Sequence, residues 1–254
     1  MLRSIVSMKN YDLGARDGRI GHVVEFYFDD ARWTLRYLVA RAGSWFTGNL
    51  ALLSPHVLGK PDDSMKSVPV DLTREQVRGS PSPETDKPVS RQFEADYYRY
   101  FGWPYYWVGP YTWGPSPFPI SPLGPKEDGH FRPEDSGEEK AKGDPHLRST
   151  DEVTGYHIEA RDGSIGHIED FLYDDRDWSI RYLVADTRNW WPGKKVLLPP
   201  DWIGDIRWLG RIVEADALRE EIRNAPEFDP SAPITPEFES RLEKYYASLS
   251  RLVG

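Results

Sequence analysis

An internal repeat at a constant spacing is the feature of this sequence that most limits how the chain can fold. Residues 11–81 align without a gap with residues 156–226. Within the repeat, the segment Arg36–Ala40 reads RYLVA and returns unchanged as Arg181–Ala185. A gapless repeat of this length predicts two copies of one small domain, related by internal duplication.

Weaker matches extend each copy to about 100 residues. Leu2-Arg3-Ser4 aligns with Leu147-Arg148-Ser149 at the same spacing. We therefore expect domains at residues 1–101 and 147–254, with residues 102–146 between them. Residues 126–145 are dense in Glu, Lys, Asp, Gly and Pro, a composition that buries little apolar surface and predicts a linker.

Inside each copy the pattern is mostly that of β-strands. Asp17-Gly18 and its counterpart Asp162-Gly163 are turn dipeptides between extended stretches. In the strand that follows, Ile20, Val23 and Phe26 are three positions apart rather than two. This spacing predicts a bulge or a sharp bend.

The next segment, Trp33–Ala40, alternates with period two, as a half-buried strand does. The alternation predicts that Trp33 and Tyr37 lie in the core and that Arg36 points outward, with Arg181 as its counterpart. One interpretation gives these arginines an exposed or edge position, paired with Asp30 or Asp175. The other makes them anchors of a shared binding face.

Two short helices are expected at the end of each copy. Asp71 and the residues after it resemble a capped helix start, and a second helix is expected after Ser90 or, in the other copy, after Thr235.

These motifs resemble the PRC-barrel family, named for the cytoplasmic part of the photosynthetic reaction-centre H subunit. The resemblance rests on residues 15–23, 26–30, 33–39 and 45–53, and on their counterparts in the second copy. It implies a mainly β protein of two tandem, small, partly open β-barrels, each followed by short helices. It also implies membership of macromolecular assemblies, as in the reaction centre or around the ribosome, rather than catalysis.

The composition narrows the class of partner. The net charge of −9 and the scattered Lys and Arg argue against nucleic acid, and no apolar run is long enough for membrane insertion. The chain has no cysteine, so thiol chemistry is excluded. We expect a cytoplasmic protein.

No catalytic, cofactor or metal motif stands out, and we expect no enzyme, no cofactor and no metal. His22 and His167 match between the copies, and we interpret them as surface or barrel-mouth residues rather than ligands. The Asp29-Asp30 pair lacks the spacing of a calcium loop and is interpreted as a polar turn.

The most unusual segment, residues 103–114, directly follows the first copy, which alone carries it. Its rings, together with Arg36 and Arg181, are the candidate partner-binding residues: Trp103, Tyr105, Tyr106, Trp107, Tyr111 and Trp113. Aromatic residues spaced by prolines suit protein recognition or sugar stacking. We interpret the segment as packing across the seam between the two copies; the alternative is an exposed aromatic patch that binds a partner.

The function expected from these patterns is that of a non-enzymatic adaptor or scaffold that binds a protein partner. One alternative is a module that binds a small molecule, a quinone or a metal at the seam. Another is a soluble protein like the reaction-centre H subunit, linked to photosynthetic electron transfer. The chain is expected to be a monomer with a pseudo-twofold repeat or a homodimer.

Overall fold

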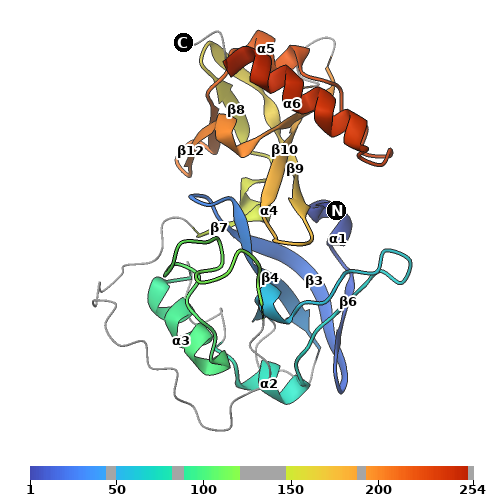
Figure 1. Cartoon of the computed structure of the whole chain (residues 1–254), viewed down its shortest axis with the longest axis vertical. Helices are drawn as coiled ribbons and strands as arrows, with labels where there is room; N and C mark the ends of the chain where they lie inside the picture. The colour runs from blue at the N-terminus through green and yellow to red at the C-terminus, as the bar shows by residue number, and fades with distance from the viewer. Residues whose placement is uncertain (44–49, 82–88, 121–146, 188–192, 251–254) are drawn as a thin grey trace. The chain divides into compact units, whose positions relative to one another are not determined.

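The computed structural model describes residues 1–43, 50–81, 89–120, 147–187 and 193–250 (Figure 1). The fold is mainly β, with two sheets, and neither sheet closes into a barrel within these residues. The chain forms two compact units. The N-unit comprises Ser7–Ser149 and Asp175–Ser179, and the C-unit comprises Met1–Val6, Thr150–Asp174 and Ile180–Gly254.

The N-unit is built on a six-stranded sheet in the order β5-β4-β3-β2-β6, with β7 paired to β3. Its strands are β2 (Asp12–Ala15), β3 (Gly18–Asp29), β4 (Thr34–Ala42), β5 (Leu50–Leu53), β6 (Ser67–Pro69) and β7 (Leu147–Ser149). Its helices are η1 (Pro55–Val57), α2 (Arg74–Gly79) and α3 (Arg91–Phe101). The short α1 (Ile5–Met8) leads into this unit.

The C-unit is built on a seven-stranded sheet in the order β11-β10-β9-β8-β13-β12, with β1 paired to β9. Its strands are β1 (Leu2–Ser4), β8 (His157–Ala160), β9 (Gly163–Asp174), β10 (Ile180–Asp186), β11 (Lys195–Leu198), β12 (Ile203–Arg207) and β13 (Ile212–Ala215). Its helices are α4 (Thr150–Val153), η3 (Pro200–Trp202), α5 (Arg219–Asn224) and α6 (Pro236–Ser250).

The first strand of each repeat lies in the sheet of the other repeat. Leu2 of β1 is opposite Asp174 of β9, and Leu147 of β7 is opposite Asp29 of β3. Each exchanged strand also ends on a serine whose hydroxyl donates to a carboxylate of the receiving strand; the pairs are Ser4 with Asp170 and Ser149 with Glu25. The two units therefore differ from the repeats 1–101 and 147–254 by a reciprocal exchange of the first strand, and the N-unit also takes the turn 175–179 from the second repeat.

The predicted bulge is present in the long strand of each unit. Val23 is opposite Ala40 and Glu25 is opposite Val39, so Val24 is an extra residue in β3. The same irregularity occurs in β9 at the counterpart position. Because the extra residue shifts the pleat, apolar residues three positions apart lie on the same buried face.

The prediction that Arg36 points outward from β4 is wrong. Every residue from Thr34 to Ala40 is buried, because the strand is covered on both faces. Trp33 lies only half-buried just before the strand, with φ of 48° and its ring stacked 5.7 Å from Phe28. Its counterpart Trp178 is buried, in the turn 175–179 that belongs to the N-unit.

The helices begin close to the predicted positions. Ser90 caps α3 by accepting a hydrogen bond from the Phe93 amide at 3.1 Å, as predicted. The capping residue of α2 is Thr73 rather than Asp71. Asp71 instead accepts a hydrogen bond from Arg16 Nε at 2.7 Å.

Candidate partner-binding face

The two equivalent long helices, α3 and α6, end differently, and the difference is one glycine. Gly102 ends α3 in the left-handed conformation, with φ of 69° and its amide donating to the Arg99 carbonyl, and glycine is the residue that adopts this conformation most readily. Its counterpart in α6 is Ala247, and α6 continues to Ser250. Residues 103–120, called the arm below, therefore fold back beside α3 in the N-unit (Figure 1).

The arm is held by aromatic packing. Trp103, Tyr106 and Trp113 are buried. The Trp103 ring stacks on Phe101 at 4.5 Å and on His56 at 4.9 Å, and Trp113 meets the edge of His56 at 5.1 Å. These three rings complete the core of the N-unit.

The arm also covers a buried ion pair. Arg36 has no exposed side-chain surface, and its Nη2 lies 2.9 Å from Asp29 Oδ2. Its Nη1 donates to the Thr112 carbonyl at 2.7 Å, and the Tyr106 ring lies 3.8 Å from the guanidinium carbon. The pairing predicted with Asp30 is thus made with Asp29, and Asp30 instead pairs with Arg148 at 2.6 Å.

A second buried carboxylate lies next to this pair. Glu94 on α3 is fully buried, and its Oε1 accepts hydrogen bonds from the Tyr37 and Tyr106 hydroxyls, both at 2.9 Å. Arg91 Nη1 lies 3.1 Å from Glu94 Oε2. Burial, with the Glu94 charge second, raises the pKa of Tyr37 and Tyr106 well above the ordinary value. Both tyrosines therefore remain protonated donors rather than bases.

The outer side of the arm is exposed. Tyr105 and Trp107 are half-buried and stack at 4.7 Å, and Tyr111 is 50% exposed. The six predicted aromatic residues thus divide equally between buried and accessible positions. One hydrogen bond joins the arm to the second repeat: Trp113 Nε1 donates to the Asp177 carbonyl at 2.8 Å. Asp177 lies in the turn 175–179, which belongs to the N-unit, so this contact lies inside that unit.

The structure brings a serine and a histidine together that no sequence motif indicates. Ser54 Oγ and His56 Nδ1 share a hydrogen bond of 2.9 Å beneath Trp103 and Trp113. Burial, with the Arg36 charge second, lowers the pKa of His56 to about 3. A weak base under two aromatic rings does not meet the requirements of an activated serine nucleophile.

The C-unit repeats the Arg–Asp pair with its arginine exposed. Arg181 Nη2 lies 3.7 Å from Asp174 Oδ2, and the Arg181 side chain is 45% exposed. These residues are the counterparts of Arg36 and Asp29. Arg181 therefore keeps the accessible position predicted from the sequence, although its partner is Asp174 rather than Asp175.

Two acidic residues of α6 act on Tyr182, the neighbour of Arg181 in the strand. Burial raises the pKa of Tyr182, and Glu239 and Glu243 raise it further, so both carboxylates act on this tyrosine beside Arg181. Glu243 replaces Tyr98, Asp201 replaces His56, and both are exposed. We call Arg181, Tyr182, Glu239 and Glu243 the Arg181 face.

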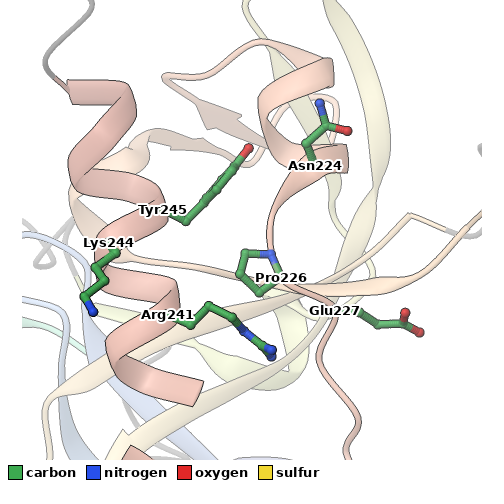
Figure 2. Close-up of a pocket in the computed structure, with 6 residues that line it drawn as sticks. All are labelled: Asn224, Pro226, Glu227, Arg241, Lys244 and Tyr245. Atoms are coloured by element: carbon green, nitrogen blue, oxygen red, sulfur yellow. The ribbon is translucent and has the colours of Figure 1, made fainter. Parts of the chain in front are cut away.

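A groove lies on another side of α6 in the same unit. Six residues line it, and Figure 2 shows Arg241 and Tyr245 projecting from α6 toward Asn224 at the end of α5 and toward Pro226 just after it; Glu227 and Lys244 complete the lining. The groove has a volume of about 530 Å³, within the range of small-molecule sites. Two cations on one helix face make an anionic ligand the better match.

The histidines that match between the copies are not part of a possible metal site among the described residues. His22 and His167 are half-buried strand residues. Across the described part of the chain, no three His, Cys, Asp or Glu side chains are grouped so that they could hold a metal ion. Among the same residues, no helix has the length and apolar character needed to span a bilayer.

Comparison with protein families finds no family whose model matches this chain, and comparison with curated proteins finds no match either.

Proposed function

We propose that this protein is a non-enzymatic adaptor that binds a protein partner through two PRC-barrel-like units derived from an internal duplication. The resemblance of the sequence to that family supports the proposal, as does the recurrence of equivalent elements at equal spacing in both units. The expected role is membership of an assembly in the cytoplasm.

One observation carries the proposal. The arginine of the same Arg–Asp pair is fully covered by the arm in the N-unit, whereas in the C-unit Arg181 is 45% exposed beside the buried Asp174. An exposed arginine next to Tyr182, with a covered counterpart in the same chain, has the character of an interface rather than of a core.

The test is partner capture with matched charge reversals. Arg181→Glu reverses the charge on the Arg181 face. Arg161→Glu is the control, because Arg161 is 44% exposed, pairs with Asp216, and lies in the same unit. A protein retained from native cells by the wild type and by Arg161→Glu, but lost with Arg181→Glu, is expected. Equal retention by both variants, or no specific protein, would reject the adaptor.

The groove of Figure 2 favours a second candidate function, the binding of a small anionic molecule. Native mass spectrometry of the purified protein tests it. A bound molecule that is lost with Lys244→Ala and kept with Arg181→Glu would support the small-molecule module.

A further inference from the structure

In the N-unit, the arm shows which chemical groups cover the arginine of the Arg–Asp pair. It supplies a backbone carbonyl, at Thr112, to the arginine, and it lays the Tyr106 ring over the guanidinium. A cation over an aromatic ring and a charge-assisted hydrogen bond are both strengthened when water is excluded. Prolines at positions 104, 110, 115, 117 and 119 restrict the free chain, which lowers the entropy lost on docking.

The Arg181 face offers the same hydrogen-bonding groups. Arg181 and Asp174 repeat the covered pair, Tyr182 repeats Tyr37, and Glu239 repeats Glu94. Whereas α3 ends at Gly102 and the chain turns back, α6 continues past Ala247 to Ser250. A separate segment with a free carbonyl and an aromatic ring would meet Arg181 as the arm meets Arg36.

The Arg181 face has one cation fewer and one acid more than the equivalent positions of the N-unit. In the N-unit, Arg91 lies 3.1 Å from Glu94, whereas the counterpart of Arg91 in the C-unit is Pro236. Glu243 adds an acid where the N-unit has Tyr98, a residue whose ring lies 6.4 Å from that of Tyr105 in the arm. A segment covering the Arg181 face must therefore bring its own positive charge to be electrostatically complementary.

We propose that the Arg181 face binds an aromatic, proline-containing segment of a partner protein that also carries an arginine or lysine. The proposal rests on the proposed adaptor function and names the chemistry of its partner. The partner's carbonyl and ring cover Arg181, and its cation lies against Glu239 and Glu243.

Two synthetic peptides test this chemistry on the full chain. The first has the sequence of arm residues 103–118, and the second has the same sequence with Tyr105→Arg, which places a cation opposite the position of Glu243. We expect the second peptide to bind the wild type about tenfold more tightly than the first, a difference of about 1.4 kcal/mol. Arg161→Glu should leave its affinity unchanged, Arg181→Glu should weaken it at least tenfold, and Glu243→Gln should remove the advantage over the first peptide.

The outcomes separate this proposal from the adaptor function. Equal affinity for the two peptides, or binding unaffected by Arg181→Glu, would overturn the proposed partner chemistry. The same binding in all variants would mean that the peptide displaces the arm in the N-unit instead. If a captured protein depends on Arg181 while neither peptide binds, the adaptor function stands and the partner chemistry is wrong.

Discussion

Arg36 and Asp29 form an ion pair of 2.9 Å with almost no contact with water, whereas their counterparts Arg181 and Asp174 are 3.7 Å apart with the arginine exposed. The difference arises from the arm, because the two pairs occupy equivalent positions on equivalent strands. One sequence motif thus holds a buried arginine in the N-unit and an exposed one in the C-unit.

Replacing the acid of each pair should separate these roles. Asp29→Asn leaves the Arg36 charge buried without its counter-ion, and we expect the N-unit to lose about 3 kcal/mol of unfolding free energy or more. Asp174→Asn should cost at most about 1 kcal/mol, because water solvates both of its cationic partners, Arg181 and the Met1 ammonium group. Hydrogen exchange read by mass spectrometry reports on each unit separately. Similar losses in the two variants would show that the arm does not seal the first pair.

The left-handed residue at the end of α3 should control the arm. Gly102→Ala places a Cβ in open space, so its cost is conformational and should be about 1–2 kcal/mol. The substitution should favour extension of α3 beyond residue 102, as α6 extends through Ala247. We expect faster amide exchange along residues 103–114. The control, Ala247→Gly, should cost about 1 kcal/mol in α6 and leave exchange in the arm unchanged.

Acid should destabilise the N-unit through His56. The pKa of this residue is lowered from 6.5 to about 3 in the folded chain, so between these values the unfolded state binds a proton that the folded state does not. Stability therefore falls as the pH falls, by about 1.4 kcal/mol per pH unit between about pH 6 and 3.5. Denaturant melts across this range should show a shallower slope for His56→Gln than for the wild type. Parallel slopes would mean that the imidazole is solvated.

The mainly β character was predictable because turn dipeptides and apolar spacing are local signals. The covering of Arg36 was not, because alternation identifies only one buried face, and the arm that covers the other face lies more than 60 residues later in the chain. His56 and Glu94 were missed as members of the site for the same reason. A weak signal existed for Glu94, since Phe93-Glu94 recurs as Phe238-Glu239.

The strand exchange could not be predicted from the pattern. Residues 2–4 and 147–149 are both Leu-Arg-Ser, so either strand satisfies either sheet. Identical segments carry no information about which copy receives them, and the choice depends on how the chain passes between the units.

The exchange itself predicts an effect far along the sequence from the change. Replacing Leu2–Ser4 with three glycines removes the side chains of β1, including the Ser4 hydroxyl that donates to Asp170, and raises the entropic cost of forming the strand. Because β1 pairs with β9, we expect faster amide exchange at residues 170–174, while β3 keeps its protection. The matched replacement of Leu147–Ser149 should do the opposite, exposing residues 25–29 and sparing β9. Loss of protection within the repeat that carries the mutation would mean that each repeat keeps its own first strand in solution.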